Sequence, residues 1–234
     1  MLLQAALNGD RTRAEHPALP LSAEELTHDA AACVAAGAGA IHLHPRDADG
    51  RESLAPEVVD AVVEAVRGAC GVSVGVTTGA WIEPDLERRL ALISGWSAPD
   101  CSSVNVCEEG SVEAMHALLG AGVGIEAGVW SVEDAEALVD SGLAGRVTRV
   151  LVEPVDAGEG CLAIVEAIHV ALDAGGLTAP RLQHGDGDAT WPLIEDAVCR
   201  GLDTRVGLED TLRDPDGATT TGNPALVRAA ARFI

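Results

Sequence analysis

The sequence predicts an α/β protein, a closed parallel (β/α)8 TIM barrel formed by a single domain over residues 1–234. Short apolar segments alternate with longer Ala-rich amphipathic segments eight times along the chain. Each pair spans about 25 to 30 residues, which suits a strand followed by a helix in a parallel sheet. No linker, low-complexity stretch or shift in composition marks a second domain. An open, doubly wound sheet is the alternative fold.

The first half of the chain supplies four strand–helix pairs. The predicted strands are residues 2–9, 40–47, 72–79 and 101–110, and the helices that follow them are residues 22–38, 55–70, 85–96 and 111–122. Ser22 and Glu25 have the spacing of a capping box at the start of the first helix. Pro56 falls in the first turn of the second helix, where its missing N–H is not needed.

The second half repeats the pattern. Its predicted strands are residues 124–130, 146–155, 180–186 and 203–210, and its helices are residues 131–145, 161–176, 189–201 and 223–234. Ser131 and Asp134 again have capping spacing. The strands begin apolar and end in polar clusters such as HPRD, TTG, HGD and EDT. Because the carboxyl ends of barrel strands form the active face, polar residues gather where chemistry is expected.

Composition excludes several classes of function. A formal net charge of −22 and a pI near 4.4 predict a surface that repels nucleic acid and anionic membranes. All 15 basic residues are Arg, so a Schiff-base or pyridoxal-phosphate lysine is excluded. The segment MLLQAALNG lacks the features of a signal peptide, and we expect a cytoplasmic protein. The 6 cysteines form no C-x-x-C pair, and most are expected in the core.

Two histidines in the segment IHLHPRD are candidate metal ligands. Residues i and i+2 of a strand point to the same face, with Cα atoms roughly 6.6 Å apart, so His42 and His44 share a face. Two imidazoles at that separation can reach one zinc ion at about 2.0 to 2.1 Å from each nitrogen. The alternative is a pair of satisfied polar side chains packed at the barrel mouth.

Glu209 in the segment RVGLED is the candidate third ligand. In a closed barrel the eighth strand lies beside the first and close to the second across the mouth. A set of two histidines and one glutamate leaves a coordination position open, as a catalytic zinc needs. The alternative is an acidic cap on the final helix or loop.

Other strand ends add polar side chains. Thr77, Thr78, Ser103 and Asn105 could present hydroxyl groups and an amide to a bound carbonyl. Further polar residues end strands five to seven, and they either contact a ligand or support the residues that do: Glu126, Glu153, His184 and Asp186. Three histidines within predicted helices are expected at the surface or in packing: His28, His116 and His169.

Four segments together resemble the β-keto acid cleavage enzymes, whose founding activity is 3-keto-5-aminohexanoate cleavage: NGDRTRAEHPALPLSAEEL, IHLHPRD, VTTGAWIEP and RVGLED. The resemblance implies a zinc-dependent barrel with one Zn²⁺ per chain that assembles as a homo-oligomer, a tetramer or a dimer. It also implies that acyl groups are exchanged between a β-keto acid and acetyl-CoA, which gives acetoacetate and a new acyl-CoA. Both substrates are small molecules.

The resemblance also assigns roles to residues of this sequence. The family's zinc ligands fall on His42, His44 and Glu209. Its catalytic base and the paired arginine fall on Asp210 and Arg205. An aspartate held near an arginine is expected to stay ionised at neutral pH and to accept a proton from the substrate. The family's polar positions on strands three and four fall on two further residues, Thr77 and Ser103.

Three departures from the family pattern concern the substrates. The family's acidic residue after strand one falls on Arg11, or on Asp10 if the gap is placed differently, and Arg11 favours an anionic substrate tail. The segment VEPVDAGEG lacks the Pro-Gly-Gly of many relatives, which predicts a different acyl-CoA side of the pocket. The chain stops at Ile234, which predicts a weaker CoA site or tetramer.

The remaining candidates for substrate binding are Glu15, Thr78, Asn105 and Glu126.

Two other functions remain open at this level. A metal-dependent aldolase or hydrolase on the same barrel would need the metal and Asp210 but no CoA. A non-enzymatic barrel that binds a metal or a metabolite and has lost activity would bind zinc but would turn over no β-keto acid.

Overall fold

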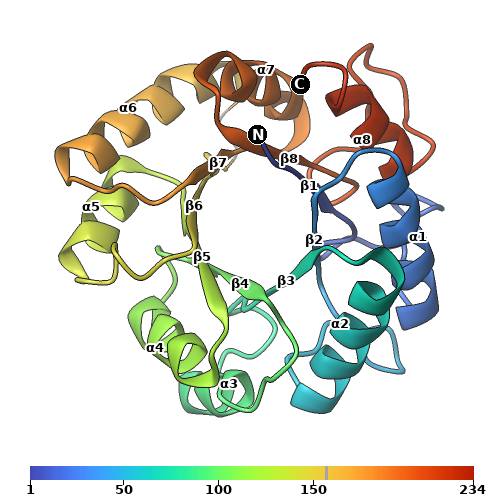
Figure 1. The fold of residues 1–234 in the computed structure, drawn as a ribbon, viewed down its shortest axis with the longest axis horizontal. Helices are drawn as coiled ribbons and strands as arrows, with labels where there is room; N and C mark the ends of the chain where they lie inside the picture. Colours follow the sequence, from blue (N-terminus) through green and yellow to red (C-terminus); the bar gives the residue numbers. More distant parts are fainter. Residues whose placement is uncertain (156–157) are drawn as a thin grey trace.

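The protein is described by a computed structural model that covers residues 1–155 and 158–234. Its strands close in sequence order into one parallel barrel, β1 to β8, and β8 pairs with β1. The helices form a ring around this barrel (Figure 1). The predicted closed (β/α)8 barrel is therefore confirmed, and the open doubly wound sheet is excluded.

The elements alternate as the sequence predicts. The strands are Leu3–Ala6 (β1), Ala40–Leu43 (β2), Ser73–Thr77 (β3), Cys101–Asn105 (β4), Gly124–Val129 (β5), Arg149–Val152 (β6), Arg181–Gln183 (β7) and Asp203–Val206 (β8). The α-helices are Ala23–Ala35 (α1), Pro56–Cys70 (α2), Leu86–Ile93 (α3), Ser111–Ala121 (α4), Val132–Asp140 (α5), Cys161–Ala174 (α6), Thr190–Arg200 (α7) and Asn223–Ala230 (α8).

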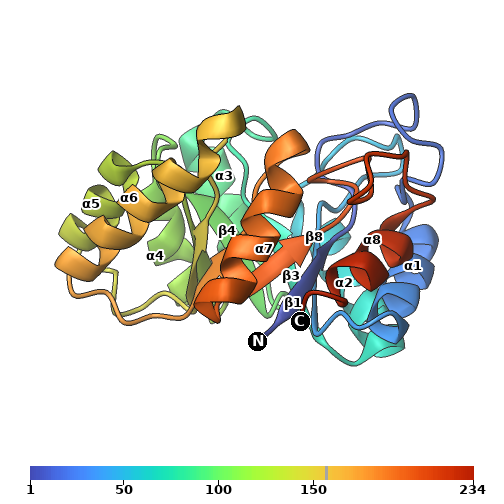
Figure 2. The same cartoon turned by 90° about the horizontal axis from the view of Figure 1, so that it is seen from above.

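The strands are shorter than predicted, because their polar carboxyl-terminal residues leave the sheet and enter loops. His44 follows the last residue of β2, and Glu209 and Asp210 follow β8 by several residues. Helix α5 also ends early, at Asp140, because Gly142, directly after the C-cap Ser141, has a left-handed φ of 73° that does not continue a helix. The loops after β1 and β8 lie at the end of the barrel opposite the two termini (Figure 2).

Both predicted capping boxes form. The hydroxyl of Ser22 accepts a hydrogen bond from the backbone of Glu25, whose carboxylate accepts one from the backbone of Ser22. Ser131 and Asp134 make the same reciprocal pair at α5. These caps satisfy N–H groups that have no partner inside the helix. The starts of α1 and α5 are therefore specified locally.

The core lies between the barrel and the inner faces of the helices. Helix α2 shows the pattern, because its four buried valines fall at i, i+3, i+4 and i+7: Val59, Val62, Val63 and Val66. The expectation that most cysteines are core residues is wrong: three are buried and the others are partly or fully exposed. Within the described residues, no helix is long and apolar enough to cross a membrane.

The closure between β1 and β8 depends on two residues with special geometry. A Cβ atom at Gly207 would lie 1.7 Å from the carbonyl oxygen of Ala6, so only glycine fits there. The Asn223 side chain at the start of α8 accepts from the backbone N–H of Leu208 at 2.6 Å and donates to the carbonyl of Leu7 at 2.8 Å. Asn223 thereby ties the segment before Glu209 to the end of β1.

The same asparagine contacts a buried acid. Nδ2 of Asn223 donates to Oδ2 of Asp29 on α1 at 2.7 Å. Burial raises the pKa of Asp29 to about 6 from 3.8, although this hydrogen bond opposes the shift. Because the folded-state pKa lies above the unfolded one, the contribution of Asp29 to stability is greatest below about pH 4 and is lost as the pH rises through 6.

We expect Asp29→Asn to be more stable than the wild type above pH 6 and closely similar to it near pH 4. The asparagine keeps an acceptor for Asn223 without a charge, and the shift corresponds to at most about 3 kcal/mol at pH 8. Urea unfolding at pH 4 and pH 8 measures the difference. An equal difference between the two chains at both pH values would contradict this account of Asp29.

Candidate active site

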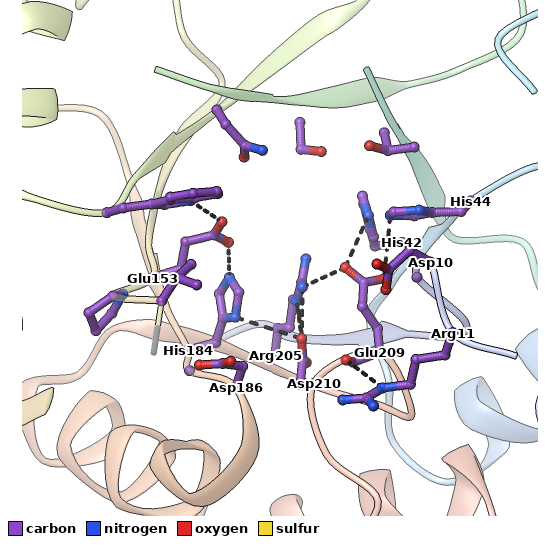
Figure 3. Close-up of a pocket in the computed structure, with 18 of the residues that line it drawn as sticks. Asp10, Arg11, His42, His44, Glu153, His184, Asp186, Arg205, Glu209 and Asp210 are labelled. Atoms are coloured by element: carbon purple, nitrogen blue, oxygen red, sulfur yellow. Dashed lines mark hydrogen bonds and ion pairs between the residues drawn. The ribbon is translucent and has the colours of Figure 1, made fainter. Parts of the chain in front are cut away.

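A cavity of about 390 Å³ opens at the carboxyl ends of the strands. Thr77 from β3 and Ser103 and Asn105 from β4 line one part of it. Figure 3 shows ten labelled residues of its wall, which come from the ends of β1, β2, β6, β7 and β8: Asp10, Arg11, His42, His44, Glu153, His184, Asp186, Arg205, Glu209 and Asp210. Residues far apart in the sequence therefore meet where the barrel fold predicts an active face.

The three predicted metal ligands converge in this cavity. Nε2 of His42 lies 3.7 Å from Oε1 of Glu209, and Nε2 of His44 lies 3.7 Å from Oε2 of the same carboxylate. One ligand atom from each residue falls within 4.8 Å of the others. These separations are too long for hydrogen bonds but suit three ligands around one small cation.

The charges of this cluster also suit a cation. Burial lowers the pKa of His42 to about 3, so its imidazole is neutral, as a metal ligand must be. Burial opposes ionisation of Glu209, but the charge of Arg205 outweighs it and holds the pKa of Glu209 well below its usual range. Among the described residues, buried Oε2 of Glu209 has no hydrogen-bond partner. A neutral nitrogen and an unpaired carboxylate oxygen fit a divalent metal.

Arg205 pairs with two adjacent carboxylates. Its Nη2 donates to Oε1 of Glu209 and to Oδ1 of Asp210, each at 2.7 Å, and its Nε donates to Asp210 at 3.2 Å. Burial raises the pKa of Asp210 even though Arg205 opposes this shift. Burial also disfavours the charge on Arg205, but the two acids outweigh it and raise the Arg205 pKa. The predicted pairing of Arg205 with Asp210 is present, and it includes Glu209.

The structure adds a partner for His44 that sequence reasoning missed. Oε1 of Glu52 lies 2.6 Å from Nδ1 of His44, and Oε2 of Glu52 accepts from the indole N–H of Trp81 at 3.1 Å. The chain returns toward the histidines in a short antiparallel turn, in which Arg46 pairs with Glu52. The Asp-Gly pair at residues 49–50 is the turn signal that could have revealed it.

A second set of a tryptophan, a glutamate and a histidine lies across the cavity. Oε2 of Glu153, after β6, lies 2.6 Å from Nε2 of His184, after β7. Oε1 of Glu153 accepts from the indole N–H of Trp130 at 2.6 Å. The sequence indicates Glu153 and His184 as polar residues at strand ends, but it gives no signal for Trp130, because the role of Trp130 depends on contacts between neighbouring strand ends.

The other predicted substrate-binding residues divide into two groups. Arg11 lines the cavity with Asn105, and its Nε donates to the carbonyl of Glu209 at 3.1 Å. In the part of the chain that the structure describes, three others do not line the cavity: Glu15, Thr78 and Glu126.

Each of these three side chains has a different partner. Glu15 pairs with Nη1 of Arg11 at 3.0 Å on the exposed side. The hydroxyl of Thr78 donates to the carbonyl of Ser103 at 2.7 Å, which turns it away from the cavity. Glu126 points into the barrel, where it is fully buried beside Gln4 and Arg149. Because these three side chains do not line the cavity, their placement does not support the expected contact with substrate.

The histidines on helices are placed as expected. His28 and His116 are exposed, and His169 is buried against the side chain of Gln183 at 2.7 Å.

The fold and the site define a (β/α)8 barrel with a candidate metal centre and a buried acid at the carboxyl ends of its strands. The sequence profile of the family described as beta-keto acid cleavage enzyme matches residues 1–157 and 178–234. The chain belongs to the β-keto acid cleavage enzyme family.

Two curated relatives carry the name 3-keto-5-aminohexanoate cleavage enzyme. The protein of Fusobacterium nucleatum subsp. nucleatum is 36% identical over 116 residues, and that of Acetoanaerobium sticklandii is 31% identical over 110 residues. Each match covers 45% of this chain and 40% of the relative, so the chain matches well under two thirds of the length of these relatives.

Solved structures share the fold at low identity. The ternary complex of ObcA with C4-CoA adduct and oxalate aligns with a TM-score of 0.74 and 18% identity, over 92% of this chain and 63% of that one. The 3-dehydroquinate dehydratase from Aquifex aeolicus VF5 aligns with a TM-score of 0.60 and 14% identity, over 100% and 99% of the two chains. At these identities the likeness supports the barrel alone.

We expect Glu52→Gln to weaken the binding of zinc to this cluster by about 10- to 100-fold, because an ionised carboxylate behind a ligating histidine raises its basicity and fixes its orientation. Competition with a chromogenic chelator measures the affinity. Trp81→Phe is the control, since it removes the indole N–H that donates to Glu52 and part of the ring that stacks on His44 but keeps the Glu52 carboxylate, and it should have a smaller effect. Unchanged zinc affinity in Glu52→Gln would show that Glu52 does not support a metal ligand.

Proposed function

We propose that this chain is a zinc-dependent β-keto acid cleavage enzyme, an acyltransferase that uses acetyl-CoA as co-substrate. It condenses a β-keto acid with acetyl-CoA and cleaves the product to acetoacetate and a new acyl-CoA. The observation that carries the proposal is the convergence of His42, His44 and Glu209 beside the buried pair of Asp210 and Arg205, in a chain of this family.

His42, His44 and Glu209 would hold the zinc ion. When bound, zinc would polarise the keto and carboxylate oxygens of a β-keto acid and stabilise the negative charge that develops on them. The lack of Lys supports this assignment, because an imine cannot supply that stabilisation here.

Asp210 would take the proton from the carbon between the two carbonyl groups. Its carboxylate is 3% exposed and lines the cavity next to Glu209, so it can face a bound substrate. Arg205 contacts both oxygens of Asp210 through its Nε and holds the acid in one orientation. A buried base with a raised pKa accepts a proton more readily than an exposed aspartate does.

Polar residues on the wall would orient the rest of the substrate. Thr77, Ser103 and Asn105 supply hydroxyl and amide groups to the cavity. Arg11 would favour an anionic substrate tail, although Glu15 already pairs with one of its guanidinium nitrogens. The preferred substrate class is therefore a β-keto acid with a second acidic group.

The proposal of an acyl-CoA partner follows from the family of this chain, and a fold neighbour that holds such a molecule is consistent with it. The structure of ObcA holds a C4-CoA adduct and oxalate, and its barrel resembles this one. The segment VEPVDAGEG, expected to alter the acyl-CoA side of the pocket, includes residues 156 and 157, which lie outside the described residues. We further propose a single-domain chain that forms a cytoplasmic homo-oligomer.

Metal analysis tests the ligand set. The purified protein should contain about one zinc per chain, and His42→Ala and Glu209→Gln should each lose most of it, because a third of the donor set is removed or neutralised. Inductively coupled plasma mass spectrometry measures the content. His16→Gln is the control, since His16 is buried but contacts Thr220 and Ala18 rather than the cavity. Full zinc content in both ligand variants would refute the assignment.

Asp210→Asn should retain zinc and lower kcat by about 10²- to 10⁴-fold, because an amide cannot accept the proton. Acetoacetate formation from a panel of β-keto acids measures the rate, with and without acetyl-CoA.

The wild type should require acetyl-CoA and should prefer dicarboxylic substrates. Equal consumption of β-keto acid without acetyl-CoA would instead support an aldolase or hydrolase. Retained activity in Asp210→Asn would place the base elsewhere.

A further inference from the structure

Two matching side-chain networks, each made of a tryptophan, a glutamate and a histidine, face each other across the cavity. On one side Trp81 donates to Glu52, and Glu52 contacts Nδ1 of His44. On the other side Trp130 donates to Glu153. Glu153 in turn contacts Nε2 of His184 (Figure 3). In both networks an indole N–H orients a carboxylate, and the carboxylate orients an imidazole.

Each imidazole then faces one of the two adjacent acids after β8. The free Nε2 of His44 lies 3.7 Å from Glu209, and the free Nδ1 of His184 lies 3.9 Å from Oδ1 of Asp210. The first network, which includes His44, supports the candidate metal centre. The second network, which includes His184, has no assigned role, although it ends at the candidate base Asp210.

His184 holds unused hydrogen-bonding capacity. Its side chain is buried, and its Nδ1 has no hydrogen-bond partner among the described residues, whereas its Nε2 lies 2.6 Å from Oε2 of Glu153. A buried polar group without a partner costs stability, which indicates a functional reason for keeping it. Both of its near neighbours are carboxylates, so a proton at either nitrogen has an acceptor close by.

We propose that His184 is the proton acceptor behind Asp210, held in place by Glu153 and Trp130. This inference rests on the proposed function and deepens it. His184 acts through Asp210 and is therefore a positioning residue of the relay, whereas Asp210 is the residue that touches the substrate carbon.

The proton path balances within the protein. The C–H bond of the β-keto acid breaks as an O–H bond forms on Asp210. That O–H bond then breaks as an N–H bond forms at Nδ1 of His184, whose Nε2–H remains directed at Glu153. The gap to Asp210 must shorten by about 1 Å, which is ordinary on substrate binding. The proton returns by the same path when the acetoacetate carbanion is protonated.

Glu153 is charged in the way that this relay needs. Burial opposes its ionisation, but His184 and Arg205 outweigh burial and lower the pKa of Glu153. An ionised carboxylate behind the ring fixes the tautomer with the proton on Nε2 and stabilises the imidazolium that forms when Nδ1 accepts the second proton. Nδ1 is thereby left free to face Asp210.

The test measures proton removal from the substrate separately from the complete reaction. The rate at which α-hydrogens of the β-keto acid exchange with D2O is measured by NMR on the zinc-loaded enzyme without acetyl-CoA, and kcat and KM for acetoacetate formation are measured separately. His184→Gln should retain zinc and a KM within about 3-fold of wild type, and should lose about 10- to 100-fold in both the exchange rate and kcat. His16→Gln, the buried control, should retain both rates.

The failures of the two proposals are distinguishable. If the wild type neither exchanges α-hydrogens nor forms acetoacetate, the proposed function itself fails, and the relay falls with it. If the wild type is active and His184→Gln exchanges and turns over at wild-type rates, only the role of His184 is overturned.

A second variant keeps the test decisive if His184→Gln does not fold. Glu153→Gln retains the size of the side chain and removes the charge that stabilises the imidazolium. It should lower the exchange rate and kcat together by about 10-fold or more at unchanged zinc content. An unchanged exchange rate in a folded Glu153→Gln protein would overturn the relay.

Discussion

The organisation of the candidate site depends on one buried guanidinium. Arg205 donates to Glu209 and to Asp210, two consecutive acids that would repel each other without it. Because Arg205 donates to both acids, Glu209 stays ionised toward the histidines while Asp210 remains at the cavity wall. A buried cation between two carboxylates is stable only when its donors are well placed, and here they contact both acids.

The barrel closure places this arginine and the two acids. Arg205 is fixed by its register opposite Gln4 on β1, and the chain then turns through Gly207 so that the acids face the cavity. Gly9 supports the same arrangement from β1, since its backbone has φ +56° and a Cβ atom there would lie 2.6 Å from Cγ of Glu209. The glycines near both strand ends thus leave room for Glu209 to approach the histidines.

Much of the fold could be predicted from the sequence because its signals are local. The alternation of strand and helix patterns, the caps at Ser22 and Ser131 and the proline at the start of α2 all act within a few residues. The convergence of His42, His44 and Glu209 was predictable as well, since the barrel brings the eighth strand end close to the second. Strand lengths were overestimated, because the polar ends belong to loops that sequence periodicity does not separate from strands.

The remaining parts of the site depend on contacts between segments far apart in the chain. Glu52 and Trp81 meet at His44 only because two loops fold over the cavity, and no periodic pattern marks either residue. Glu126 looked like a cavity residue at a polar strand position, yet its side chain pairs with Gln4 and Arg149 inside the barrel. Glu126 is the third residue of β5, so it lies deeper in the barrel than the carboxyl strand ends that line the cavity.

The most direct test of the central claim is diffraction at the zinc absorption edge from crystals of the zinc-loaded protein. The account predicts one strong anomalous peak per chain, about 2.0 to 2.2 Å from Nε2 of His42, from Nε2 of His44 and from an oxygen of Glu209, with Asp210 outside the first coordination shell. A peak bound by other residues, or no peak in this cavity, would contradict the account.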